Sequence, residues 1–225
     1  MFAPGLISYR SHLSQNWRSA IRQDSWIADL EALGFCGPTR DLLLAGQSAL
    51  ADFIGRSSEK TSAWREMPAD IIFGPPIPDP DKIICIGLNY SFVAGYSAFN
   101  DVSARDLQLQ VSQWTIGKAI DTFAPMGPGM VPAYLVPDPQ KLELTTRLNG
   151  QVVQRTSTSD MIFSVAEIIG YLSRSMTLEP GDIIATGTPS GVGFKREPAL
   201  FLKSGDVVDI EISSIGLLSN PVVRP

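Results

Sequence analysis

The stretch that decides the fold class spans residues 142–155 and reads LELTTRLNGQVVQR. Two short segments, Leu142 to Leu148 and Gln151 to Arg155, flank Asn149-Gly150, the preferred pair for a tight turn between antiparallel strands. Apolar and polar residues alternate over residues 207–212, which follow the turn signal Ser204-Gly205-Asp206. We therefore predict an α+β architecture that is mostly β and mostly antiparallel.

Helical spacing is limited to three segments. Apolar positions between residues 39 and 54 fit one amphipathic helix, with Gly46 as its weak point. A second helix is expected over residues 101–110. A third is expected after Ser159-Asp160, where apolar residues repeat at helical spacing from residue 162 to residue 172.

The length and composition predict a folded chain with a proline-rich division. The 225 residues are 44% hydrophobic and 18% charged, which is enough for a large core and argues against disorder. Residues 74–80 read GPPIPDP, a stiff extended segment typical of a linker. We therefore predict a small N-terminal domain over 1–75 and a larger catalytic-fold domain over 76–225.

The charge and hydropathy of the chain exclude some classes of binding partner. The formal net charge is −5, the isoelectric point is about 4.9, and no basic patch is visible, which argues against nucleic acid and acidic membrane surfaces. No apolar run reaches the ~18 residues that span a bilayer. Cys36 and Cys85 are expected to be buried reduced thiols of a cytoplasmic protein. Three arginines and no acid in residues 1–23 leave the mitochondrion as the alternative.

Three loop motifs and one lysine carry residues suited to chemistry. Taken alone, each has an ordinary structural explanation. Asp101 could cap a helix, pair with Arg105 or ligate a metal, Lys118 could be a solvated surface group, and Thr188 could belong to a simple turn. The motifs are IGLNY (86–90), NDVSARDLQ (100–108), GK (117–118) and TGTPSGVG (186–193).

In this order the motifs resemble the fumarylacetoacetate hydrolase family. Its members cleave, decarboxylate or isomerise small 2-oxo acids at a divalent metal. The resemblance covers most of the chain and is densest over 82–128 and 178–220. It implies a mixed β-sandwich roll and metal-dependent C–C bond hydrolysis, decarboxylation or isomerisation of a small 2-oxo acid such as an acylpyruvate or oxaloacetate.

The resemblance also implies roles for single residues. Asp101 would be a ligand of Mg²⁺ or Mn²⁺. Lys118 and Thr188 would be catalytic, because the enolate charge that develops on a 2-oxo acid needs a cation and donors beside it. The residues implied in substrate binding, two of which would also order their loop, are Asn89, Tyr90, Arg105, Gln108 and Gly187.

One departure from the family decides how much of this activity to expect. The family's catalytic His and Glu and its Glu-x-Glu metal pair should follow Tyr90, yet several tens of residues are missing between Ser91 and Phe92. The single histidine is His12, and no glutamate occurs between residues 82 and 142. The fold should therefore be incomplete and metal binding weak. The missing stretch should contain core strands, so its loss would expose sheet edges and apolar surface, through which we expect a homodimer to form. The chain is either an active enzyme, an impaired remnant or dimerisation partner, or a sequence that lacks an internal stretch through a skipped exon or a wrong gene model.

Overall fold

The computed structural model describes residues 4–11, 17–36, 39–59, 61–74, 83–84 and 93–224. The larger of its two antiparallel sheets joins strands from the N-terminal part of the chain to two strands from its middle. These strands are β1 (Gly5–Ser11), β2 (Arg18–Gln23), β3 (Trp26–Asp29), β4 (Trp64–Glu66), β5 (Ile71–Gly74), β7 (Gly95–Phe99) and β8 (Met126–Pro132). They run in the order β4-β3-β2-β1-β8-β7, with β5 also paired to β1.

The second sheet is formed by the C-terminal half of the chain. Its strands are β9 (Glu143–Leu148), β10 (Gln151–Ser157), β12 (Val207–Ile212) and β13 (Gly216–Pro221), in the order β10-β9-β12-β13. The predicted hairpin is confirmed: Asn149 and Gly150 both have positive φ, 51° and 78°, as a two-residue turn of this kind requires. A short parallel pair joins β6 (Ile83–Ile84) to β11 (Ile183–Ile184). The prediction of a mostly β fold is thus confirmed.

The helices are short and lie at the periphery. They are α1 (Thr39–Leu44), α2 (Gln47–Glu59), α3 (Arg105–Gln108) and α4 (Val165–Leu172), with single 3₁₀ turns η1 (Thr61–Ala63), η2 (Trp114–Gly117), η3 (Ala133–Leu135), η4 (Thr158–Asp160) and η5 (Gly193–Lys195). None of the helices in the described ranges has the length and apolarity that a membrane span requires.

Three helix predictions need correction. The single helix expected over 39–54 is two, because Gly46 adopts φ 92° and ends the first one. The helix expected over 101–110 shrinks to α3, whose N-cap Ala104 supplies no side-chain bond. The third helix starts later than expected, at a capping box in which Ser164 and Glu167 bond each other's backbone N–H.

Cys36 is also exposed rather than buried. It lies in the connection between β3 and α1, away from the core. Cys85 falls outside the described residues.

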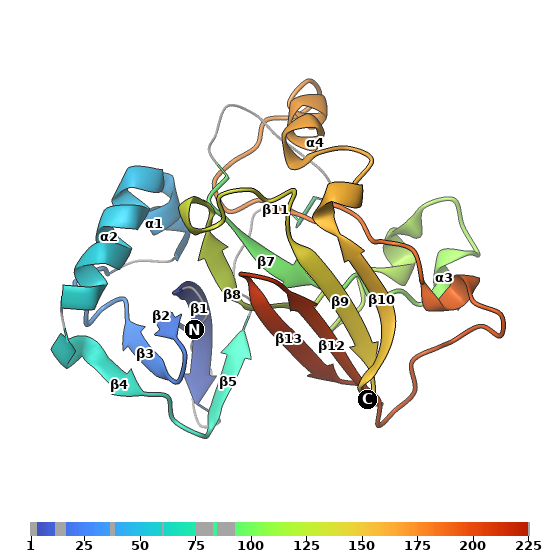
Figure 1. Ribbon diagram of the computed structural model, residues 1–225, viewed down its shortest axis with the longest axis horizontal. Coiled ribbons are helices and arrows are strands. Elements are labelled where there is room, and N and C mark those ends of the chain that lie inside the picture. Colours follow the sequence, from blue (N-terminus) through green and yellow to red (C-terminus); the bar gives the residue numbers. More distant parts are fainter. Residues whose placement is uncertain are drawn as a thin grey trace.

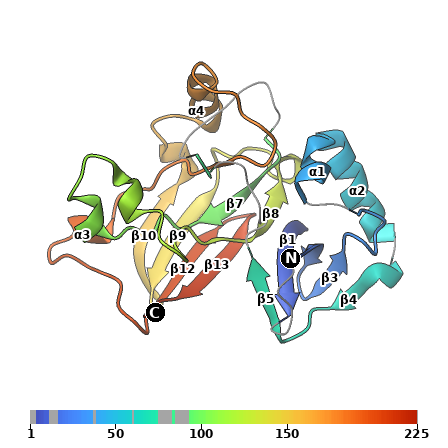
Figure 2. The same ribbon diagram turned by 180° about the vertical axis from the view of Figure 1, so that it is seen from behind.

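Two packing layers hold the molecule together. α1 and α2 cover one face of the large sheet, where Leu43 and Leu50 join Leu6 and Ile21 in one apolar cluster. β7 and β8 lie between the N-terminal strands and the smaller sheet, as both views show (Figures 1 and 2). The contact with the smaller sheet is apolar and consists of Ala98 against Val208, Ile210 and Leu218.

The large sheet continues across the boundary predicted between residues 75 and 76. β1 pairs with β8 through Leu6 and Met130, so an N-terminal strand borders the strands that lead to the predicted site. Most of the proline-rich segment lies outside the described residues. The two-domain division therefore stays a prediction.

Candidate active site

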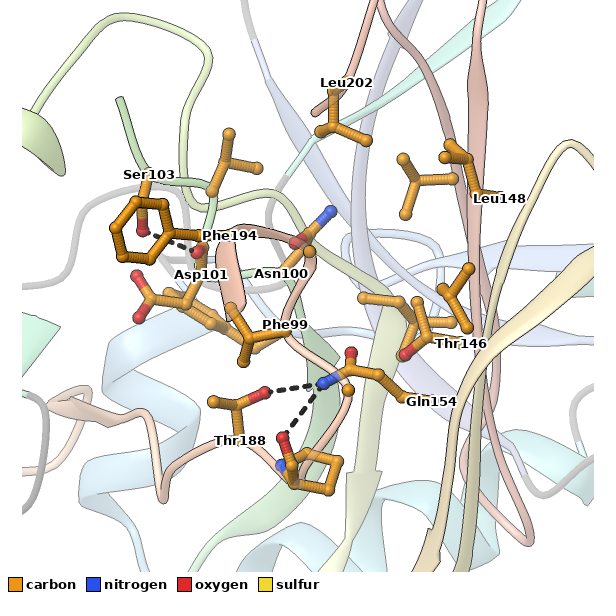
Figure 3. A pocket seen from close by; sticks show the side chains of 18 of the residues that line it. Phe99, Asn100, Asp101, Ser103, Thr146, Leu148, Gln154, Thr188, Phe194 and Leu202 are labelled. Atoms are coloured by element: carbon orange, nitrogen blue, oxygen red, sulfur yellow. Dashed lines mark hydrogen bonds between the residues drawn. The ribbon is translucent and has the colours of Figure 1, made fainter. Parts of the chain in front are cut away.

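A cleft of about 1060 Å³ opens beside the smaller sheet. Its walls come from four places: the end of β7 with the loop after it, the loop after β11, the loop after η5, and strands β9, β10 and β12. Figure 3 shows Phe99, Asp101 and Thr188 around this space. Several walls are apolar, including Leu148, Phe194 and Leu202, and polar groups are concentrated on the two loops. An apolar cleft with a few convergent polar groups is the usual form of a small-molecule site.

Asp101 lines this cleft, and Lys118, which is not itself a lining residue, contacts Asp101. Asp101 Oδ2 forms an ion pair with Lys118 Nζ, and the two side chains are 43% and 27% exposed. The loop that carries Asp101 is held in place because Ser103 Oγ donates to the Asp101 carbonyl at 3.1 Å and Asn100 N donates to Pro125 O at 2.9 Å. The fold therefore brings together Asp101 and Lys118, two of the residues that the resemblance places in the active site.

The ion pair is supported by tight packing between α3 and η2. Gln108 is only 2% exposed, and its Oε1 accepts a hydrogen bond from Arg105 Nη1 at 2.7 Å. Gly117 is buried against it, and a Cβ there would lie 2.6 Å from Gln108 Cβ. Ala104 N donates to Gly117 O at 2.9 Å. Gln108 therefore orders the loop, and it is Arg105, not Gln108, that lines the cleft.

Thr188 reaches the cleft from the loop after β11. Gly187 precedes it with φ +109°, a conformation that favours glycine. Thr188 Oγ1 lies 3.2 Å from Gln154 Nε2 on β10, and the same amide contacts the Pro189 carbonyl at 3.1 Å (Figure 3). The loop is thus fastened to the smaller sheet on one side and open to the cleft on the other.

Arg196 fastens the same loop a second time. Its Nε donates to Gly191 O at 3.1 Å, and its Nη2 donates to Val153 O. Gly191 has φ +96°, and a Cβ there would lie 2.6 Å from Val153 O, so the loop approaches β10 more closely than a larger residue would allow.

The charges around the cleft favour an anion, although the whole chain is acidic. Arg105, Arg147 and Arg196 line it together with two aspartates. Arg147 is neutralised by Glu211, at 2.7 Å. Among the described residues no carboxylate pairs with Arg105, whose guanidinium stacks over the Phe194 ring at 5.6 Å. Arg105 and Arg196 therefore contribute positive charge that would attract an anionic ligand.

The residues present do not fit a divalent metal held by protein ligands alone. Mg²⁺ and Mn²⁺ prefer several oxygen ligands in near-octahedral geometry. Over the described ranges no group of three His, Cys, Asp or Glu side chains could hold a metal ion. Asp101, the predicted ligand, has its carboxylate engaged by Lys118.

The other predicted site residues divide into two groups. Arg105, Gly187 and Thr188 line the cleft with Asp101. Asn89 and Tyr90 lie outside the described residues, as does the junction at Ser91. The roles of all these residues stay predictions. Two residues that sequence reasoning missed, Gln154 and Arg196, hold the loop of Thr188, and no local motif points to either.

Comparison with known proteins defines the class. The model of the family described as "Fumarylacetoacetate (FAA) hydrolase C-terminal" matches residues 82–223, and the chain belongs to this family. It is 53% identical over 133 residues to oxaloacetate tautomerase YisK of Bacillus subtilis, a match that covers 59% of this chain and 44% of that protein. The chain thus spans less than half the length of this relative.

Solved structures extend the likeness to the fold. Fumarylacetoacetate hydrolase from Exiguobacterium antarcticum superposes with a TM-score of 0.79 at 26% identity, covering 98% of this chain and 100% of that one. Fumarylpyruvate hydrolase from Pseudomonas aeruginosa, in complex with Mn²⁺ and pyruvate, gives a TM-score of 0.53 at 36% identity, covering 59% and 55%. The predicted fold class is confirmed, and a divalent metal is supported at the level of the family.

Proposed function

We propose that this chain binds a small 2-oxo acid in the cleft and catalyses slow keto–enol tautomerisation of oxaloacetate. The observation that carries the proposal is the ion pair of Lys118 with Asp101, since Asp101 lines the same cleft as Thr188. The 53% identity to an oxaloacetate tautomerase supports the choice of substrate over an acylpyruvate.

The chemistry asked of these residues is modest. Tautomerisation breaks one C–H bond next to the carbonyl and forms one O–H bond on the carbonyl oxygen, with no net change in atoms. The intermediate is an enolate, whose negative oxygen is stabilised by a fixed cation and hydroxyl donors. Lys118 supplies ammonium N–H donors, and Asp101 holds the ammonium in place. Thr188 supplies a hydroxyl, and water in the open cleft carries the proton from carbon to oxygen.

Binding of the substrate carboxylates is assigned to the arginines. Arg105 is held by Gln108 on one side and by the Phe194 ring on the other, so its guanidinium is pre-oriented. An arginine fork matches a carboxylate with two parallel hydrogen bonds. This arrangement favours a dicarboxylate or a 2-oxo acid over a neutral ligand.

A catalytically impaired relative is the second candidate. It is favoured by the lack of glutamate between residues 82 and 142 and by the lack of a three-ligand cluster in the described part of the chain. Loss of a placed acid or base typically costs ~10²–10⁴ in rate. We therefore expect turnover well below that of a complete family member. A homodimer in the cytoplasm, with the mitochondrion as alternative, stays our prediction.

The test is the rate at which enol oxaloacetate equilibrates with the keto form, after subtraction of the buffer rate. Lys118→Met should lower the enzymatic rate at least about tenfold, because it removes a charged donor from the enolate. Lys141→Met is the matched control, since Lys141 forms a similar pair with Asp138 on an exposed surface. Equal rates for the two variants would contradict the proposal.

A further inference from the structure

We infer that Gln154 is a positioning residue that fixes Thr188 as a hydrogen-bond donor to the substrate. The inference rests on the proposed function, because it concerns how the cleft holds a 2-oxo acid. The Nε2 atom of Gln154 lies 3.2 Å from Thr188 Oγ1, 3.1 Å from Pro189 O and 3.3 Å from Ser190 O. One side-chain amide thus faces three oxygens of the same loop.

The orientation of this amide follows from chemistry. The carbonyls of Pro189 and Ser190 can only accept hydrogen bonds. An amide turned the other way would set Gln154 Oε1 against both carbonyl oxygens and leave no donor for them. The nitrogen therefore faces the loop, and Thr188 Oγ1 accepts one of its hydrogens.

A hydroxyl that accepts on one side has its own proton left to donate. Thr188 is exposed on the cleft, so this proton is available to an oxygen of a bound ligand. A carboxylate or enolate oxygen is a strong acceptor, and such charge-assisted bonds exceed neutral ones in strength. Without the amide of Gln154 the hydroxyl would rotate freely and would present its lone pairs to the anion as readily as its proton.

A bulge in β10 is a second, independent observation that points to Gln154. The register with β9 shifts between Val152 and Gln154, so Val153 has no residue opposite it on β9. Bulges of this kind re-aim side chains and often occur beside active sites. Here the carbonyl of Val153 accepts from Arg196, while the next side chain, Gln154, turns to the loop. Two consecutive residues of one strand therefore hold the loop that carries Thr188.

The experiment is a double-mutant cycle on the full chain, with oxalate as the probe and calorimetric titration as the readout. Oxalate is a planar dianion that copies the two adjacent oxygen-bearing carbons of an enolised 2-oxo acid. Gln154→Met keeps the side-chain length, and Thr188→Val keeps the side-chain shape. Each should weaken oxalate binding roughly tenfold, as does loss of a hydrogen bond to a charged group. In the Thr188→Val background, Gln154→Met should cost no more than about a further twofold.

Two further variants separate positioning from loop support. Thr188→Ser keeps the hydroxyl, so it should bind oxalate nearly as well as the wild type and should remain sensitive to Gln154→Met. Gln151→Met, at the exposed start of the same strand, should bind like the wild type. Thermal melts of every variant establish that it is folded.

Three results would count against the inference. If Gln154→Met weakens binding by the same factor whether residue 188 is Thr or Val, the amide only supports the loop and the inference is overturned. It is also overturned if Gln154→Met leaves oxalate binding unchanged. If the wild-type chain binds no oxalate at all, the proposed function itself fails and this inference fails with it.

Discussion

Replacement of Gly117 by alanine should disrupt the packing between α3 and η2 that positions Lys118. A Cβ at this position would lie 2.6 Å from Gln108 Cβ, 2.8 Å from Ala104 O and 2.9 Å from Gln108 Cα. Two of these three atoms belong to the backbone, so the neighbours can yield only if α3 and η2 move apart. Lys118 follows directly, and its ammonium would shift away from Asp101.

The size of the effect can be worked out from these contacts. Inserting a methyl group into a packed site costs about 1–3 kcal/mol, and the lower entropy of the unfolded alanine chain offsets about 0.4–1 kcal/mol. We expect the free energy of unfolding to fall by about 1–2 kcal/mol, or by about 2–8 °C in melting temperature for a chain of this size. Tautomerisation of oxaloacetate should fall with it.

Gly170→Ala is the matched control. Gly170 lies within α4 and no atom lies within 4 Å of an added Cβ. The same substitution there should raise stability by about 0.5–1 kcal/mol, since alanine suits a helix better than glycine. Urea denaturation of both variants compares the two positions directly. If Gly117→Ala were as stable and as active as the wild type, the tight packing behind Lys118 would be refuted.

Three more predictions follow from other parts of the fold. Ser164→Ala should cost about 1 kcal/mol of unfolding free energy, because it removes the cap at the start of α4; an unchanged urea midpoint would refute the cap's importance. Burial, followed by the hydrogen bond to Asp29, raises the pKa of Tyr9 from 10.0 to about 12. The unfolded chain therefore loses this proton first, so stability should fall as pH rises from 10 to 12, and Tyr9→Phe should make that fall shallower in alkaline melts. In Gly191→Ala the new Cβ would lie 2.6 Å from the Val153 carbonyl oxygen on β10, and residue 191 would have to keep φ +96°. The oxalate affinity of this variant should therefore drop. An unchanged affinity would show that binding does not need the close approach of the loop to β10.

The parts of the fold that local chemistry controls could be predicted from the sequence. The Asn149-Gly150 hairpin needs only two residues that tolerate positive φ between two strand-forming segments, and the prediction of this hairpin is confirmed. The helix over 39–54 was predicted as one because its apolar spacing is continuous. The structure breaks it at Gly46, where a positive φ outweighs the pattern.

The candidate site was accessible to sequence reasoning only in part. Asp101 and Lys118 belong to recognisable motifs 17 residues apart, and they meet in the structure. Gln154 belongs to no motif. Its contact with Thr188 depends on a bulge in β10 and on the return of a loop 34 residues later, and such long-range geometry leaves no local pattern.

The most direct test of the account is the rate of oxaloacetate tautomerisation by the intact chain, first with a metal chelator and then with rising Mn²⁺. We predict a rate above that of buffer in chelator, a loss of that rate in Lys118→Met, and an effect of Mn²⁺ only at millimolar concentration, because one carboxylate and waters hold a divalent ion weakly. A chelated protein no faster than buffer, with turnover restored by micromolar Mn²⁺ and lost again in Asp101→Ala, would contradict the account and would mean that other residues complete a metal site.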